Sequence, residues 1–282
     1  MSKVAVVTDS TAYIPQDLLI QYSIRVAPQI LIWGNDTYLD GEDIKPQEFY
    51  QRLEKDKVHP TTSQVTPAEF KEIFAELLEK EHKILAILIS SKLSGTIDSA
   101  NQALESFPGA PIEIIDSQST SMAMGFQVLA AARAAQEGAT LAECKALAEK
   151  AIQCTGVVFA VNTLEFLHRG GRIGGGARFL GTALNIKPIL ELRDGRVEAL
   201  ERVRTRKRSL ARLVELVKER TAGKQPIRVA VLHANAPEEA REVLEQARME
   251  LSAVESVFSE VSPVIGTHAG PGTIGLAYMA GM

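Results

Sequence analysis

The chain has 282 residues, 45% of them hydrophobic, and a formal net charge of −4. This length suits one large domain or two ordinary ones with substantial cores. The slightly acidic balance argues against a general electrostatic attraction to nucleic acid or to anionic membranes.

The sequence shows no sign of a membrane segment or a secretion signal. No apolar run reaches the roughly 18 residues that cross a bilayer. The first apolar run is interrupted by Asp9 and Ser10, so it does not form the core of a signal peptide. We therefore expect a cytoplasmic protein that does not span a membrane.

The two cysteines, Cys144 and Cys154, are expected to be free thiols. On one continuous helix their Cα atoms would lie about 15 Å apart. A disulfide needs Cα atoms within about 7 Å. Their spacing does not match a metal site, and we expect no bound metal.

The first half of the chain alternates strands with helices. Residues 4–7, 25–33, 84–89 and 112–115 predict strands, and Pro28 makes the second one irregular. Thr66, Pro67 and Glu69 form a capping-box pattern at the start of a helix. This alternation predicts an α/β layer with a parallel sheet.

The pattern changes near residue 156 to hairpins mixed with helices. Asp194-Gly195 between strand-like runs at 188–192 and 197–203 predicts a β-hairpin. Strands are also expected at 157–161 and 227–232, and helices at 209–221 and 237–251. We therefore predict an α/β protein with an N-terminal parallel-sheet domain, residues 1–155, and a C-terminal α+β domain with a mixed sheet, residues 156–282.

Small polar residues follow three of the predicted strands. They are Asp9-Ser10-Thr11, the stretch from Ser90 to Thr96, and Asp116-Ser117. Ligands of open α/β sheets bind beyond the carboxyl ends of the strands, so we expect these hydroxyls to converge on one crevice. For Asp9 and Asp116 a capping or supporting role is favoured.

Gly270, Gly272 and Gly275 match the G-x-G-x-x-G dinucleotide fingerprint. That fingerprint works between a strand and a helix, with an acidic residue about 20 residues further on. Seven residues follow Gly275 in the sequence and none is acidic, so we expect no dinucleotide cofactor. The glycines instead predict a tight turn that presents His268 and Thr273.

Two functional hypotheses remain open from the residues alone. Ser94 and His268 could serve an esterase or phosphotransferase, although Leu-Ser-Gly-Thr at 93–96 is not a nucleophile elbow. The basic run at 202–208 could contact a partner or nucleic acid, or could be a solvated helix start. The acidic net charge weakens the nucleic-acid hypothesis.

Several short motifs, in this order, together resemble the DegV family. They are Val7-Thr8-Asp9-Ser10-Thr11, Thr61-Thr62-Ser63-Gln64-Val65-Thr66-Pro67, Leu93-Ser94-Gly95-Thr96, Asp116-Ser117, Leu167-His168-Arg169-Gly170-Gly171-Arg172-Ile173 and His268-Ala269-Gly270-Pro271-Gly272-Thr273.

The resemblance implies two domains that clasp one long-chain fatty acid, such as palmitate, in an apolar tunnel between them. It implies that hydroxyls hold the carboxylate, those of Thr62 (or its neighbour Thr61) and Ser94, with His268 close by and Thr273 in the adjoining turn. On this reading the protein is a lipid-binding protein with no cofactor, and not an enzyme.

The DegV family also includes the acyl-carrying subunits of bacterial fatty acid kinases, in which a separate ATP-dependent protein phosphorylates the bound acid. This chain has no Walker pattern, so a partner would supply that chemistry. Arginines suit phosphate oxygens. The candidates for contact with a phosphate or with the partner are Arg169, Arg172, Arg202 and Arg204.

Overall fold

Runs of aliphatic residues near the start of the chain form a parallel sheet. The computed structural model describes residues 3–180 and 186–282. In the strand order β2-β1-β6-β7, every pair is parallel. Strands β1 and β6 are almost wholly buried, because helices cover both faces of the sheet, and this burial explains their continuous apolar sequences. The strands are β1 (Val4–Asp9), β2 (Arg25–Ala27), β6 (Lys83–Leu88) and β7 (Ile112–Asp116).

The second half of the chain forms a mixed sheet with the strand order β10-β9-β8-β13-β11-β12. The predicted hairpin is confirmed: β9 and β10 pair antiparallel, and Asp194 (φ 50°) and Gly195 (φ 79°) adopt the positive φ values of a tight hairpin turn. Strands β11 and β12 are parallel. The strands are β8 (Thr155–Ala160), β9 (Lys187–Arg193), β10 (Arg196–Val203), β11 (Ile227–His233), β12 (Glu255–Glu260) and β13 (Ile274–Ala280).

The predicted single strand at residues 25–33 is wrong, because the chain divides there between two sheets. Residues 25–27 form β2, whereas β3 (Ile30–Trp33) pairs antiparallel with β4 (Asp36–Leu39) and β5 (Thr61–Ser63) in a small sheet. Pro28 has no N–H for a continuing ladder. The small sheet was missed because its strands are short, and β5 consists only of Thr and Ser.

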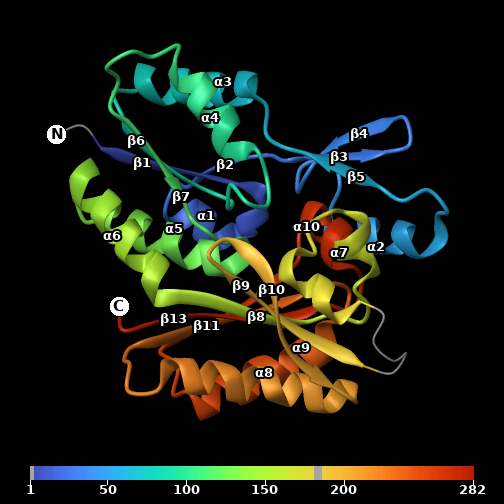
Figure 1. Ribbon diagram of the computed structural model, residues 1–282. Coiled ribbons are helices and arrows are strands. Elements are labelled where there is room, and N and C mark those ends of the chain that lie inside the picture. The colour runs from blue at the N-terminus through green and yellow to red at the C-terminus, as the bar shows by residue number, and fades with distance from the viewer. Residues whose placement is uncertain (1–2, 181–185) are drawn as a thin grey trace.

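The helices and the two large sheets are stacked in alternating layers (Figure 1). Helices α3 and α4 cover the outer face of the parallel sheet, α5 and α6 lie between the two large sheets, and α8 and α9 cover the outer face of the mixed sheet. The helices are α1 (Gln16–Gln21), α2 (Pro46–Lys55), α3 (Pro67–Glu79), α4 (Thr96–Leu104), α5 (Ser121–Gln136), α6 (Leu141–Cys154), α7 (Glu165–Arg169), α8 (Arg206–Thr221), α9 (Pro237–Glu250) and α10 (Pro263–Ala269), with short 3-10 helices η1 (Ser10–Ala12) and η2 (Gly174–Phe179).

Helix α5 is apolar on nearly every side because it is covered by both large sheets. Its residues 121–132 are all buried, and it contacts β1 on one side and β8, β11 and β13 on the other. A helix that is apolar all round is typical of such a position. Cys144 and Cys154 both lie on α6 and are free.

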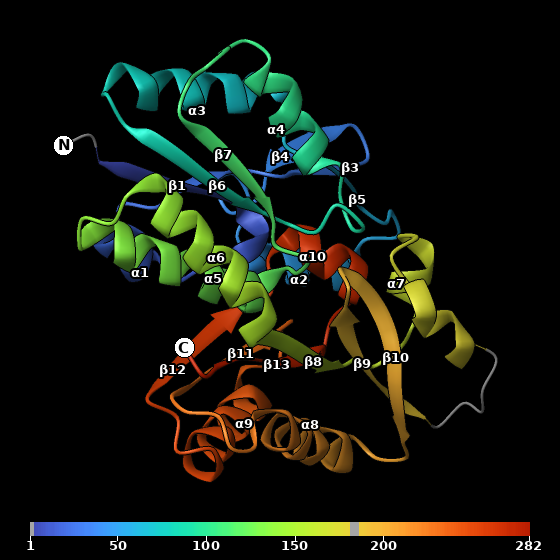
Figure 2. The same ribbon diagram turned by 60° about the vertical axis from the view of Figure 1, so that its left-hand side comes forward.

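Helix α10 brings the C-terminal region to the small sheet and α2 (Figure 2). It begins at Pro263, and the Oγ of Ser262 accepts a hydrogen bond of 3.2 Å from the N–H of Ile265. The tight turn predicted to present His268 and Thr273 is therefore partly wrong, because His268 lies in the last turn of this helix and β13 begins at Ile274.

The Gly270-x-Gly272-x-x-Gly275 segment runs from a helix into a strand, the reverse of the dinucleotide fingerprint. Gly270 (φ 78°) and Gly272 (φ 76°) take left-handed conformations that suit glycine and reverse the chain between α10 and β13. No helix start points at a ligand from this segment, so its order does not support dinucleotide binding.

Candidate functional site

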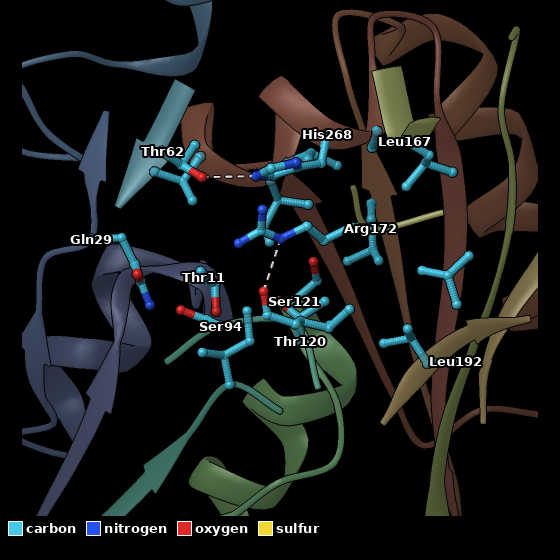
Figure 3. Close-up of a pocket in the computed structure, with 18 of the residues that line it drawn as sticks. Thr11, Gln29, Thr62, Ser94, Thr120, Ser121, Leu167, Arg172, Leu192 and His268 are labelled. Carbon is cyan, nitrogen blue, oxygen red and sulfur yellow. Dashed lines mark hydrogen bonds between the residues drawn. The ribbon is translucent and has the colours of Figure 1, made fainter. Parts of the chain in front are cut away.

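A cavity of about 200 Å³ lies between the ends of the parallel strands, the small sheet and the mixed sheet. Figure 3 shows hydroxyl, imidazole and guanidinium groups gathered on one side of it, with Leu167 and Leu192 on the other. Much of the remaining wall is apolar, and the apolar side chains that line it are those of Ile89, Leu93, Val157, Phe159, Leu167, Leu192, Val197, Leu232, Val261, Val264, Ile265 and Ala269.

Thr62 and His268 meet at the polar side of this cavity. The Oγ1 of Thr62 and the Nε2 of His268 are 2.8 Å apart. Thr62 is the middle residue of β5 and is half-buried, whereas Thr61 is exposed. Alternation along the strand therefore turns Thr62, and not Thr61, toward His268.

His268 is held as a neutral imidazole. Burial and, to a smaller extent, the positive charge of Arg172 together lower the pKa of His268 to about 4. Its Nδ1 is buried and has no hydrogen-bond partner among the described residues. A Cβ on Gly170 would lie 2.0 Å from that Nδ1, so the close approach of the two residues requires glycine.

A second group of hydroxyls surrounds Ser94. The Oγ of Ser94 is 2.9 Å from the Oγ1 of Thr96, which also accepts a hydrogen bond of 2.8 Å from the Nε2 of Gln29. Thr11, in η1 directly after β1, lines the same cavity. The predicted convergence of strand-end hydroxyls is thus confirmed for Thr11 and Ser94.

Asp9 and Asp116 hold loop backbone, as their favoured supporting role predicts. The carboxylate of Asp9 accepts hydrogen bonds from the N–H and hydroxyl of Thr11 and from the N–H of Ile89. The carboxylate of Asp116 accepts from the N–H of Gln118 at 2.8 Å and from the hydroxyl of Ser91 at 2.6 Å. Neither aspartate lines the cavity.

Arg172 places a cation inside the site, between His268 and Ser94 (Figure 3). Its Nε donates to the carbonyl of Leu93 at 3.0 Å and its Nη1 to the carbonyl of Gly170 at 2.8 Å. These two bonds fix the guanidinium plane beside the hydroxyls.

Thr120, which also lines the cavity, was not expected as a site residue. Its Oγ1 is buried and has no hydrogen-bond partner in the part of the chain that the structure describes. Gln29 and Ser121 line the cavity as well and were also missed. Thr120 and Ser121 lie only a few residues beyond the Asp116-Ser117 strand end, and that polar run was the signal that could have identified them.

Of the other predicted site residues, Thr273 lines the inner cavity, whereas Arg169, Arg202 and Arg204 do not. Thr273 lines the cavity, but its hydroxyl donates to the carbonyl of Ala269 at 2.8 Å. Arg169 is exposed, pairs with Glu165 and lines a second, outer cavity. Arg202 and Arg204 are exposed at the end of β10 and line neither cavity.

The outer cavity shares a wall with the inner one. It has a volume of about 230 Å³, and Thr62, Arg172 and His268 line both. His59, Thr61 and Arg169 line only the outer one. Thr62, Arg172 and His268 therefore lie between the polar end of the inner cavity and the outer cavity.

Ser94 and His268 do not form a nucleophile and base pair in this structure. His268 bonds to Thr62 and Ser94 bonds to Thr96. Within residues 3–180 and 186–282, no carboxylate accepts from the Nδ1 of His268, so the orienting third group of a triad is missing. The same residues contain no cluster of metal-ligating side chains and no helix that could cross a membrane.

Comparison with known proteins identifies the family. A family model described as "Uncharacterised protein, DegV family" matches residues 3–281. A DegV domain-containing protein of Clostridium perfringens is 38% identical over 279 residues, 98% of each chain.

Solved structures match over the same extent. A DegV family protein from Thermus thermophilus, whose structure is described in terms of fatty acid binding, is 36% identical, with a TM-score of 0.92 over 99% of both chains. DegV of Bacillus subtilis, described as a fatty acid binding protein, is 33% identical, with a TM-score of 0.90 over 99% of this chain and 100% of that one. With the α/β fold and nearly the whole sequence matched, this chain belongs to the DegV family.

Proposed function

We propose that this protein binds a long-chain fatty acid, such as palmitate, in the inner cavity between its N-terminal (1–155) and C-terminal (156–282) domains. The observation that carries the proposal is one cavity with polar groups at one side and apolar walls elsewhere. The similarity to DegV proteins described as fatty acid binding supports it.

The carboxylate would lie beside Thr62, Ser94 and His268. A proton on Nδ1 of His268 would be a buried donor with no acceptor, so the favoured tautomer carries its proton on Nε2. That Nε2–H donates to Thr62, whose own hydroxyl proton is then free for a carboxylate. Arg172 supplies the compensating positive charge, and the unpaired hydroxyl of Thr120 supplies one more donor.

The acyl chain would supply most of the affinity. Each methylene group that leaves water gains about 0.8 kcal/mol, so the 14 or so methylenes of palmitate gain roughly 11 kcal/mol before ordering and association costs. The hydroxyls then select the head group, and the apolar wall holds the tail.

We propose that the bound acid is carried or presented to an ATP-dependent fatty acid kinase partner. The outer cavity supports this role, because its lining residues Arg169 and Arg172 would meet a phosphate close to the carboxylate. Arg202, which stacks on the ring of Phe179 at 4.9 Å, and Arg204 are further candidates for the partner contact.

Mass spectrometry of an organic extract of the purified protein tests the proposed ligand. We expect a fatty acid of about 14 to 18 carbons, or tight binding of added palmitate by the delipidated protein. The absence of both results would refute the proposal.

The proposed kinase partner has its own test. Incubation of the loaded protein with the ATP-binding subunit of a fatty acid kinase and ATP should release acyl phosphate, and the Arg169→Ala variant should release less of it.

The esterase alternative is tested separately. Labelling of Ser94 by a fluorophosphonate, or hydrolysis of a nitrophenyl ester that is lost in Ser94→Ala, would favour an enzyme. The separate pairing of Ser94 and His268 leads us to expect neither result.

A further inference from the structure

Asp40, which directly follows β4, is a buried carboxylate that joins two separate segments. Its side chain is 1% exposed. Its Oδ2 accepts from the hydroxyl of Ser10 at 2.6 Å, and its Oδ1 accepts from the N–H of Val264 at 3.3 Å. Ser10 belongs to η1, directly after β1, whereas Val264 belongs to α10, so one carboxylate connects the two sides of the proposed head-group site.

The first connection runs from Asp40 to Ser94. The Oγ of Ser10 accepts from the N–H of Gln29 at 3.1 Å, and the Nε2 of Gln29 donates to the Oγ1 of Thr96 at 2.8 Å. Thr96 and Ser94 are joined by 2.9 Å. Because Thr96 already accepts from Gln29, its own proton can go to Ser94, which leaves the Ser94 proton for a ligand.

The second connection runs from Asp40 to His268. Val264 is in the first turn of α10, where main-chain N–H groups have no partner within the helix. Asp40 satisfies one of these groups and Ser262 satisfies the next. The opposite end of the same short helix carries His268, which reaches Thr62.

We propose that Asp40 is a positioning residue that sets the arrangement of the Ser94 hydroxyl relative to His268, and so the preference for a carboxylate head group. This inference rests on the proposed fatty acid binding. An ionised carboxylate only accepts hydrogen bonds, so it fixes the direction of both donors at once. Burial raises the pKa of Asp40 to about 6, which leaves the group ionised at neutral pH.

The test compares palmitate with 1-hexadecanol, which has the same chain length and no carboxylate. Asp40→Asn keeps the size of the side chain but replaces one acceptor oxygen with an NH₂ donor, so either Ser10 or Val264 loses its acceptor. We expect the affinity for palmitate to fall at least about tenfold, with the affinity for hexadecanol within about twofold of wild type. The His268 ring resonance in ¹H–¹⁵N spectra should also shift.

Asp116→Asn is the matched control. Like Asp40, Asp116 lies at the end of a strand and accepts hydrogen bonds from neighbouring loop residues, here Ser91 and Gln118. It ends β7 of the parallel sheet, however, and lies outside the cavity. It should leave both affinities and the His268 resonance unchanged. If Asp40→Asn does not fold, Ser10→Ala cuts the first connection alone and should give the same selective loss of palmitate.

Three outcomes are decisive. Unchanged palmitate binding in the folded Asp40→Asn or Ser10→Ala protein would overturn the inference. So would an equal loss of palmitate and hexadecanol, since that result indicates a purely structural role. Failure of the wild-type protein to bind any fatty acid would instead refute the proposed function. This binding is measured before any variant is made.

Discussion

The Nε2 of His268 lies 2.8 Å from the Oγ1 of Thr62, although the two residues are 206 positions apart. This contact joins α10 to the short strand β5 and separates the inner cavity from the outer one. A group held at this contact would touch residues from both halves of the chain.

Removing the two hydroxyls should loosen the ligand without unfolding the protein. Thr62→Ala combined with Ser94→Ala removes two donors, each with a net contribution of about 1 kcal/mol, so we expect palmitate to bind roughly 10- to 100-fold more weakly. Isothermal titration of the delipidated protein measures this change. Thr61→Ala, on the exposed side of the same strand, is the control, and fatty acid retention by the double variant would show that the head-group assignment is wrong.

A methyl group at Gly170 should displace His268. The φ of Gly170 is −76°, which alanine adopts readily, but its Cβ would lie 2.0 Å from the Nδ1 of His268. We expect Gly170→Ala to weaken palmitate binding while the secondary structure is retained. Gly176→Ala, whose Cβ would have its nearest neighbour at 3.5 Å, should bind normally. Equal affinities of the two variants would contradict the proposed role of His268.

The neutral state of His268 should make stability depend on pH. Its folded pKa of about 4 lies below the ordinary 6.5, so the unfolded chain takes up a proton first as the pH falls. The contribution of His268 to the free energy of unfolding is therefore complete above pH 6.5 and is lost between 6.5 and 4, by at most about 3 kcal/mol.

Urea unfolding of the wild type and of His268→Gln at several pH values isolates this effect. Buried carboxylates such as Asp40 contribute to both proteins and cancel in the difference. The wild type should lose more stability than the variant between pH 6.5 and 4, and parallel pH profiles would show that His268 titrates normally.

A bulky residue in the apolar wall should shorten the acceptable chain. Leu192 lies on β9, across the cavity from Thr62 (Figure 3). Leu192→Trp should disfavour palmitate relative to laurate, by about fourfold for each methylene that no longer fits. Competition binding measures this ratio. Met249→Trp, at a site that is 67% exposed, should not change it, and an unchanged ratio in Leu192→Trp would place the tail elsewhere.

Local sequence patterns correctly predicted the strands that are buried on both faces and the hairpin turn. The strands around residues 84–89 and 227–232 are apolar because both faces are covered, and Asp194-Gly195 specifies its turn through positive φ values. The same patterns failed for residues 25–33, where one apolar run serves two sheets, and for α10, whose seven residues contain no helical period. Strand partners are selected by tertiary packing, which local propensity does not record.

The sequence by itself determined the α/β class, the hairpin and the set of small polar residues after the strands, because each depends on neighbouring residues and on burial. Only the tertiary structure decided that Thr62 rather than Thr61 faces His268, that Arg172 lies inside the cavity, and that Asp40 connects both sides. The contacts of His268 and of Asp40 depend on where α10 packs against β5 and α2. That position is set by the whole core and not by any local run of residues.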